Sequence, residues 1–426
     1  MVVYTVNDNS RIEELSKRSL ISNLANKDLS VLDKENFIIF PQQLSDSEDL
    51  NKGHFIFEQR NGETRTCNVV GIISDAQDEV RIHSRFSRSG KEDFFLRYML
   101  QTVLNYNVVS STSNSSEEIS YYDLLVFLFP YYLNEAMRKG IYKEYVRRQY
   151  NDANIKGPID IARHLKNNVP FVGKVAYRTR EFSHDNSVIQ LVRHTIEKLQ
   201  SENLFLLSGD EGTKENIRGI KRVTNSYSRM ERPDVIQENI LNPVKHGYFE
   251  EYAALQRLCI QILREERTGF GDDDNKINGI IIDVAWLWEE YIWKVTGWKH
   301  YGRKSGLDTM PFFEVLGSDS QQHRYPDFVY GGIPIDTKYK RNIDKRNDYN
   351  QLTTYIHLMK ATKGGFLQPT DHYSNSGYSK LGNLYGGGEL FSYKFFIPQE
   401  YKNYDDFQSQ MKLEESKLKS LNILST

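Results

Sequence analysis

The sequence predicts a mixed α+β protein, in which a strand-rich and helical N-terminal region precedes an α/β domain whose central mixed sheet is flanked by helices. Three observations lead to this prediction. Short apolar runs between polar breaks, at residues 37–40 and 69–73, are typical of strands. Longer segments carry apolar residues at helical spacing. A Gly331-Gly332 pair between two β-rich runs predicts a tight hairpin near the C-terminal end.

Two breaks in the pattern predict how the chain is divided. A Ser, Asn and Glu cluster at residues 110–120 has no apolar periodicity, which indicates an internal loop. A second break covers residues 242–247, and the main boundary is expected there. Residues 1–245 are therefore expected to form an N-terminal region, which the loop can split into two subdomains. Residues 246–426 are expected to form the C-terminal domain.

Composition indicates a globular protein and excludes several classes. With 426 residues, of which 39% are hydrophobic and 26% charged, two or three domains can each bury a core. The formal net charge of −2 gives no global attraction to nucleic acid, so DNA contacts need local basic clusters or a partner. Cys67 and Cys259 lack C-x-x-C spacing, which argues against a zinc site or disulfide framework and fits a reducing cytoplasm.

Neither a signal peptide nor a membrane span is expected. Residues 1–9 lack a basic start and a sustained apolar core. The most apolar run, at residues 124–133, contains Pro130 and is only about ten residues long, which is too short to cross a bilayer. A buried helix is expected there, within a helical pattern at residues 121–150 whose basic residues are interpreted as a solvated face.

A second block of the N-terminal region runs over residues 157–199. It predicts a short apolar helix at residues 161–165 and a longer helix with an apolar stripe from Val188 to Leu199. Arg178 and Arg180 lie between these helices. Contacts to a phosphate or a partner protein are one interpretation of these arginines, but surface ion pairs are the favoured one.

The C-terminal domain is predicted to begin with helices at residues 248–264 and 281–295. The triple Asp between them lacks the alternating ligands of a calcium loop and is interpreted as an exposed turn. The second helix is almost wholly apolar apart from Glu289 and Glu290. Because a buried acid needs a partner or a metal ion, one of the two is a candidate site residue. The alternative is a narrow solvent stripe that carries both acids.

The hairpin at residues 328–335 carries the strongest candidate site. If the two residues on either side of the Gly-Gly turn pair with each other, then Asp327 lies opposite Asp336, with Cβ atoms about 4.5–5.5 Å apart. Lys338 joins them on that face. Facing carboxylates are destabilising unless a cation lies between them, and oxygen ligands suit Mg²⁺ or Mn²⁺. This pattern predicts metal-dependent phosphodiester hydrolysis. An exposed hairpin with solvated acids is the alternative, and Pro334, which lacks a ladder donor, can shift the register.

A helix expected at residues 344–360 follows the hairpin and carries Gln351 and Tyr355 on one face. Such a helix can offer polar side chains to a DNA backbone or to the lysine, although a partly exposed polar face explains them nearly as well. The densest basic cluster of the chain lies in the same region and suits a phosphate track. It consists of Lys338, Lys340, Arg341, Lys345 and Arg346.

Together these motifs resemble the PD-(D/E)xK nuclease superfamily. More narrowly, they are similar to McrC, the family of endonuclease subunits of McrBC-type restriction systems. The similar segments are Trp288-Glu289-Glu290-Tyr291, Tyr325-Pro326-Asp327, Asp336-Thr337-Lys338-Tyr339-Lys340, Gln351-Leu352-Thr353-Thr354-Tyr355 and residues 157–186 before them. The resemblance covers residues 155–365, and the first 150 residues match only by position and size.

The resemblance implies which residues bind a metal ion. Asp327, Asp336 and Glu289 would hold Mg²⁺, with Mn²⁺ as a substitute. Glu289 matches the helix acid of the family better than Glu290 does, because it directly follows Trp288. The choice between the two glutamates stays open at this point.

The resemblance also implies the roles of the neighbouring polar residues. Lys338 would orient or activate the hydrolytic water, and Gln351 and Tyr355 would support it. Thr337 stands where many relatives carry a small residue and is expected to point away from the acids.

Finally, the resemblance implies a partner and an activity. The chain would be the Mg²⁺-dependent endodeoxyribonuclease subunit of a GTP-dependent restriction complex. This complex would act in the cytoplasm in defence against phage. McrB-like AAA+ GTPases form hexameric rings that bind specific or methylated DNA, and the N-terminal region would dock on such a ring and stimulate it. This chain lacks a G-x-x-x-x-G-K-[ST] loop, so GTP is expected to bind the partner.

Cleavage of double-stranded DNA would involve two copies of the chain within the assembled complex. Two alternatives remain open. The chain can be a non-catalytic adaptor or regulator of an AAA+ partner, or a stand-alone PD-(D/E)xK nuclease.

Overall fold

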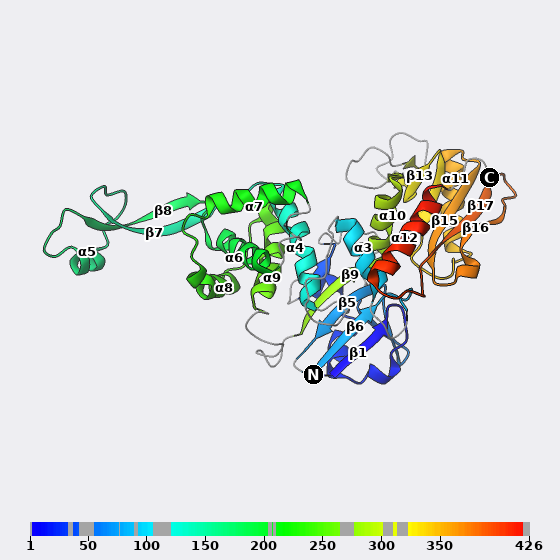
Figure 1. Cartoon of the computed structure of the whole chain (residues 1–426), viewed down its shortest axis with the longest axis horizontal. Coiled ribbons are helices and arrows are strands. Elements are labelled where there is room, and N and C mark those ends of the chain that lie inside the picture. Colours follow the sequence, from blue (N-terminus) through cyan, green and yellow to red (C-terminus); the bar gives the residue numbers. More distant parts are fainter. Residues whose placement is uncertain are drawn as a thin grey trace. The chain divides into compact units, whose positions relative to one another are not determined.

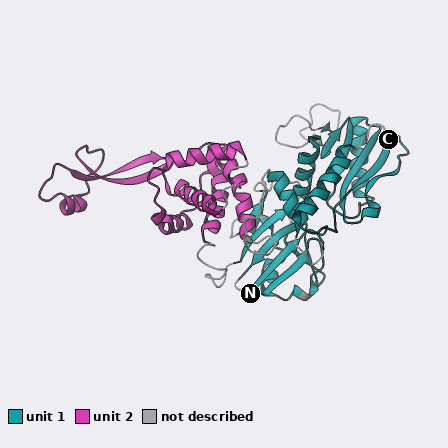
Figure 2. Cartoon of the chain, in the orientation of Figure 1, with its two compact units in different colours: residues 1–105, 114–121, 273–426 teal, residues 106–113, 122–272 magenta. Residues whose placement is uncertain are grey.

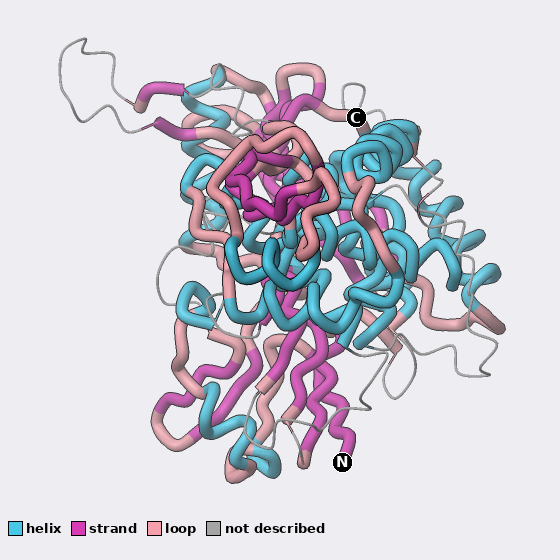
Figure 3. The backbone as a smooth tube through the Cα atoms, turned by 90° about the vertical axis from the view of Figure 1, so that its left-hand side faces the viewer, coloured by secondary structure: helices cyan, strands magenta, loops and turns pink. Residues whose placement is uncertain are grey.

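The computed structural model describes residues 2–32, 37–41, 55–75, 77–88, 93–104, 121–202, 207, 210–264, 277–300, 310–312 and 323–420. The chain divides into two compact units, one formed by residues 1–105, 114–121 and 273–426, the other by residues 106–113 and 122–272 (Figure 2). Both units contain helices, and both contain strands, which confirms the mixed class (Figure 3). The units do not follow the predicted boundary at residue 245, because the chain returns to the first unit only after residue 272. The expected loop at residues 110–120 and the triple Asp lie outside the described residues.

A five-stranded sheet in the first unit has the strand order β1-β6-β5-β9-β2 (Figure 1). β2 and β5 confirm the two predicted strands. β9 runs antiparallel to β5 and parallel to β2, so a strand from the C-terminal half completes the N-terminal sheet. The predicted helix at residues 281–295 was therefore wrong at its start, since residues 281–283 end this strand. The strands are β1 (Val2–Asn7), β2 (Phe37–Phe40), β5 (Val69–Ser74), β6 (Asp78–His83) and β9 (Asn278–Asp283).

One hydrophobic core joins this sheet to two short helices. Leu20 and Leu24 of α1 (Ser19–Leu24) are fully buried in the same cluster as Ile73 and Ile82 of the sheet. The interior strand β9 is buried and apolar along most of its length, as expected for a strand that has a neighbouring strand on each side. The remaining elements here are η1 (Glu13–Leu15), α2 (Leu29–Leu32) and the hairpin of β3 (Phe57–Arg60) and β4 (Glu63–Thr66).

A six-stranded sheet in the same unit has the order β10-β13-β14-β15-β17-β16. Its middle strands β14, β15 and β17 are parallel, and the outer strands pair antiparallel, so the predicted mixed sheet is confirmed. The strands are β10 (Lys299–His300), β13 (Phe328–Tyr330), β14 (Ile333–Thr337), β15 (Lys363–Thr370), β16 (Gly377–Asn383) and β17 (Glu389–Phe396). Nearby lie the pair β11 (Met310–Pro311) and β12 (His323–Arg324) and the 3₁₀ helix η6 (Tyr373–Asn375).

Four further helices of the first unit lie in the described residues. α10 (Val284–Thr296) begins where Asp283 accepts hydrogen bonds from two backbone amides, and it ends at Gly297, whose φ is +65°. It contacts α3 (Phe94–Leu104) and α12 (Tyr404–Lys419). The predicted helix after the hairpin is confirmed as α11 (Asn347–Met359), whose Leu352 and Ile356 share a core with Phe366 of β15.

The second unit combines packed helices with a long two-stranded arm (Figure 1). The apolar run at residues 124–133 is confirmed as part of a buried helix, α4 (Tyr121–Met137). Within the described ranges, no helix has both the length and the apolarity that a membrane crossing requires. The other helices are α6 (Ser187–Glu202), α7 (Glu211–Val223), α8 (Arg232–Leu241) and α9 (Glu250–Arg264), with 3₁₀ turns η4 (Arg229–Glu231) and η5 (Gly247–Phe249).

The arm consists of β7 (Glu144–Asp152) and β8 (Val175–Ser183), which pair antiparallel, with α5 (Ile161–Asn167) in the connection at the far end (Figure 1). The helix predicted over residues 121–150 was therefore wrong beyond Met137. Gly140 has a φ of +91°, which stops the helix, and the alternating residues of β7 gain a partner strand that lies far along the sequence. The helices predicted at residues 161–165, 188–199 and 248–264 are confirmed as α5, α6 and α9.

Candidate active site

The hairpin adopts the predicted register. Tyr330 pairs with Ile333 and Phe328 pairs with Ile335, and Pro334 does not shift the ladder. Gly331 and Gly332 have φ values of +56° and +82°, the left-handed pair that a type I′ hairpin turn requires. The sequence Gly-Gly thus brings the residues before β13 next to the end of β14.

Asp336 lies at the centre of the candidate site. Its side chain is completely buried in β14, which runs between β13 and β15. In the part of the chain that the structure describes, neither carboxylate oxygen accepts a well-directed hydrogen bond. Burial, followed by the charge of Asp327, raises the pKa of Asp336 to about 8, although Lys338 acts in the opposite direction. A buried carboxylate without hydrogen bonds is costly and needs a functional explanation.

Lys338 joins Asp336 to helix α11. Its ammonium nitrogen lies 2.9 Å from Asp336 Oδ2 and donates a hydrogen bond of 3.1 Å to Gln351 Oε1. Gln351 in turn donates to the Tyr355 hydroxyl at 2.9 Å. Burial alone would lower the pKa of Lys338. The charges of Asp336 and Asp327 raise this pKa by more than burial lowers it, so the net direction is upward. The structure therefore brings together the lysine and the two polar residues that the sequence placed on one helix face.

Asp327 lies beside Thr337. Its Oδ2 accepts hydrogen bonds from the backbone N–H of Thr337 at 2.6 Å and from the Thr337 hydroxyl at 2.8 Å. The expectation that Thr337 points away from the acids is wrong, because Asp327 lies just outside the strand ladder and can turn toward this backbone amide. The charge of Asp327 still acts on both Asp336 and Glu289.

Glu289 reaches this region from α10 and pairs with a histidine. Its Oε1 lies 2.8 Å from Nε2 of His300. Burial and then the charge of Asp327 raise the pKa of Glu289 to about 7, and His300 partly offsets them. His300 lies opposite Phe328 in the β10–β13 pair, and Phe328 directly follows Asp327 in the sequence. These contacts favour Glu289 over Glu290 as the helix acid of the site.

Sequence reasoning did not identify His300. A signal for it exists: Gly297 ends the helix, and the next three residues return the chain toward the sheet. A buried glutamate on a helix needs a proton, a cation or a hydrogen-bond donor, and a histidine shortly after that helix can supply one.

The described ranges contain no group of three or more His, Cys, Asp or Glu side chains arranged to hold a metal ion as they stand. Asp327 instead accepts hydrogen bonds from Thr337, and Glu289 pairs with His300. The donor chemistry nevertheless fits a hard divalent cation, because all three acids offer oxygen, and within the described residues neither oxygen of buried Asp336 accepts a well-directed hydrogen bond. Asp327 and Glu289 would have to turn from their present partners to join such a site.

The predicted phosphate track is partly neutralised. Lys340 forms an ion pair with Asp348, and Arg341 lies 2.7 Å from Asp371. Lys345 and Arg346 are exposed, and neither has an ion pair within the described ranges. A role in phosphate binding stays a prediction for these last two residues.

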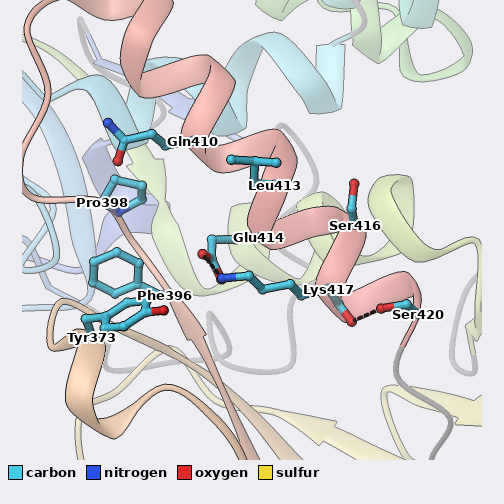
Figure 4. A pocket seen from close by; sticks show the side chains of 9 residues that line it. All are labelled: Tyr373, Phe396, Pro398, Gln410, Leu413, Glu414, Ser416, Lys417 and Ser420. Atoms are coloured by element: carbon cyan, nitrogen blue, oxygen red, sulfur yellow. Dashed lines mark hydrogen bonds and ion pairs between the residues drawn. The ribbon is translucent and has the colours of Figure 1, made fainter.

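A separate cavity of about 540 Å³ lies at one face of α12 (Figure 4). Phe396 and Tyr373 approach it from one side, and Leu413 and Lys417 from the helix (Figure 4). None of the residues of the candidate site lines it, so the cavity is not part of the site.

Comparison with known proteins gives one family match. The model of the family described as McrBC 5-methylcytosine restriction system component matches residues 64–368, a range that includes Glu289, Asp327, Asp336, Lys338 and Gln351. No curated protein matches the chain significantly.

Two similarities to solved structures are weak. One is to a chain of the refined half-complex from a tetradecameric assembly of Thermococcus gammatolerans McrB AAA+ hexamers with bound McrC. Identity there is 12% and the TM-score 0.46, over 97% of this chain and 100% of that chain. The other is to the cryo-EM structure of the Thermococcus gammatolerans McrBC complex, at 12% identity and a TM-score of 0.32, over 69% of this chain and 87% of that chain.

Proposed function

Because this chain belongs to the McrBC 5-methylcytosine restriction system component family, we propose that it is the DNA endonuclease subunit of a GTP-dependent restriction complex. Its partner would be an McrB-like AAA+ GTPase, and two copies of the chain would cut double-stranded DNA within the assembly. One observation carries the nuclease part of the proposal. It is the buried Asp336 carboxylate, whose oxygens accept no well-directed hydrogen bond within the described residues and whose Oδ2 lies 2.9 Å from the Lys338 ammonium.

The order of elements supports a PD-(D/E)xK fold for the C-terminal part. The acid-bearing helix α10 precedes the hairpin, β14 carries Asp336 and ends just before Lys338, and α11 follows with Gln351. The parallel neighbour β15 places β14 inside the sheet. This sequence of helix acid, hairpin, D-x-K strand and helix is the one expected from the resemblance.

Asp336, Asp327 and Glu289 are the residues proposed to hold Mg²⁺ or Mn²⁺. When bound, the ion would stabilise negative charge that develops on the phosphodiester during hydrolysis. Lys338 stays an ammonium at neutral pH, since the acids beside it raise its pKa. It therefore acts as a hydrogen-bond donor to the attacked phosphate or the attacking water, not as a base. Gln351 holds this ammonium through Oε1.

The direct test combines the full chain with an McrB-type GTPase, GTP, Mg²⁺ and DNA that carries 5-methylcytosine. We expect cleavage that stops when the divalent cation is chelated. Lys338→Met should reduce cleavage by about 100-fold or more, because it removes the donor for the developing charge. Complex formation and GTP hydrolysis should persist in this variant. If the wild-type complex hydrolyses GTP but never cuts DNA, the chain is an adaptor.

The arm of the second unit is the proposed docking element for the GTPase. Its far end exposes a group of apolar side chains, and exposed apolar clusters mark interaction sites. Their exposed fractions are 69% for Ile161, 59% for Leu165, 64% for Val169, 69% for Phe171 and 61% for Val172.

Charge on the arm supports the same role. Arg147 and Arg180 lie directly opposite each other in the ladder, and neither has an ion pair within the described ranges. Facing like charges destabilise a hairpin, so an acidic partner surface would relieve them. Surface ion pairing, which sequence alone favoured, is confirmed for Arg178, whose guanidinium lies 2.8 Å from Asp160, and is wrong for Arg180.

Replacing Phe171 and Val172 with Asp should weaken binding to the GTPase by roughly tenfold or more and reduce its stimulation, because charge replaces apolar contact area. Both side chains are exposed, so folding should be unaffected. Affinity and GTP hydrolysis are measured with purified proteins. Leu413→Asp is the matched control, since Leu413 is 64% exposed in the other unit. Equal binding by the two variants would exclude the end of the arm as the docking element.

A further inference from the structure

The position of Lys338 depends on residues beyond its strand. β14 ends at Thr337, so Lys338 lies outside the regular ladder. Its backbone N–H donates to the Leu367 carbonyl at 2.9 Å, and its own carbonyl accepts from the Lys340 N–H at 2.9 Å. The position of the Lys338 ammonium beside Asp336 therefore also depends on the contacts that hold residues 339–341.

Tyr339 is held by a loop of the N-terminal sheet. The loop, residues 84–86, follows β6 directly. The Tyr339 side chain is buried, and its hydroxyl lies 2.6 Å from Ser84 Oγ in a hydrogen bond. The Arg85 guanidinium lies 5.1 Å from the centre of the Tyr339 ring, and the Phe86 ring packs edge-on at 5.1 Å. Three consecutive loop residues thus contact this one side chain.

Buried acids fix the loop itself. Asp93 Oδ2 accepts a hydrogen bond from the Ser84 N–H at 2.6 Å, and Asp8 Oδ2 accepts from Arg85 Nε at 2.8 Å. A second connection runs back to the strand, since Arg341 donates to the Arg85 carbonyl at 2.6 Å. The loop is therefore held by hydrogen bonds to Asp93 and Asp8 that do not involve Tyr339.

We propose that Tyr339 is a positioning residue for Lys338, and that the loop of residues 84–86 is part of the active-site scaffold. The peptide unit between residues 338 and 339 is a rigid plane, so anchoring Tyr339 restricts the backbone from which the Lys338 side chain extends. The N-terminal sheet then supports the nuclease site in addition to any role in the complex. Its effect on cleavage, though not the anchoring itself, rests on the proposed nuclease function.

The test breaks the hydrogen bond between Tyr339 and Ser84 by removing either one of the two hydroxyl groups. Tyr339→Phe and Ser84→Ala should each raise amide hydrogen exchange at Lys338, whose N–H bonds to Leu367, and leave exchange in β13 unchanged. Cleavage by the full complex should fall about tenfold, because small displacements of a catalytic group are costly. Binding of Mn²⁺, measured by titration calorimetry, should stay unchanged, since no proposed ligand is altered. Ser84→Ala keeps the test valid if Tyr339→Phe folds poorly.

Tyr98→Phe is the matched control. It also removes a tyrosine hydroxyl that hydrogen-bonds within the first unit, in this case to Glu415 Oε1 at 2.8 Å, but it does not touch the D-x-K strand. Exchange at Lys338 that is the same in Tyr98→Phe and Tyr339→Phe would overturn the inference. Increased exchange in Tyr339→Phe together with a wild-type complex that never cuts DNA would support the anchoring and overturn the nuclease proposal.

Discussion

Asp336→Asn is expected to abolish DNA cleavage while it stabilises the metal-free protein near pH 8. The loss should reach about 10³-fold or more, because the buried carboxylate is the central proposed ligand and the partner of Lys338. The stability gain follows from burial: the carboxyl group is fully enclosed, it accepts no well-directed hydrogen bond from the described residues, and its pKa is raised to about 8. A neutral amide of nearly the same shape avoids ionisation in that environment.

Two measurements on the same variant check this expectation. Cleavage is assayed with the complete complex, and stability by chemical denaturation in the presence of a chelator. Asp78→Asn is the control, since Asp78 is also a buried acid of the first unit but belongs to β6 of the N-terminal sheet. It should leave cleavage intact. Near-normal cleavage by Asp336→Asn would disprove the assignment of the active site.

The metal-free protein should lose stability as pH rises from about 4 to about 8. Glu289 and Asp336 have pKa values raised to about 7 and about 8, so the folded state holds protons that the unfolded state releases at lower pH. Their stabilising contribution is complete below the ordinary carboxyl pKa and is lost as pH rises through the folded values. Since one pKa unit corresponds to about 1.4 kcal/mol, the two groups together should account for several kcal/mol.

A divalent cation should reverse this trend, because it binds the ionised carboxylates. Stabilisation by Mn²⁺ should therefore increase with pH up to about 8, and binding should release protons. Denaturation across this pH range, with Mn²⁺ or with chelator, measures both effects, and the double variant Glu289→Gln, Asp336→Asn should show neither. A wild-type stability profile that is as flat as that of the double variant would argue against raised pKa values at Glu289 and Asp336.

Local sequence was sufficient for the hairpin and for α11. A two-residue Gly-Gly turn determines which residues face each other, so the pairing around β13 and β14 followed from turn chemistry alone. Helical spacing likewise placed Gln351 and Tyr355 on one face, where Gln351 reaches Lys338. These features depend on residues that are close together in the chain.

Long-range pairing was not predictable in the same way. Ile281 and Ile282 suit either a helix or a buried strand, and only pairing with β5 and β2 makes them part of β9. Residues 144–150 likewise become a strand only because β8 lies beside them. The partners are far away in sequence, so no local pattern identifies them.

The sequence by itself determined the D-x-K spacing, the hairpin that brings Asp327 toward Asp336, and the family to which those motifs point. Only the tertiary structure decided the environment of these groups: the complete burial of Asp336, the pairing of Glu289 with His300, and the anchoring of Tyr339 by a loop some 250 residues earlier. Spacing is a local property of the chain, whereas burial and charge coupling arise from segments that meet only after folding.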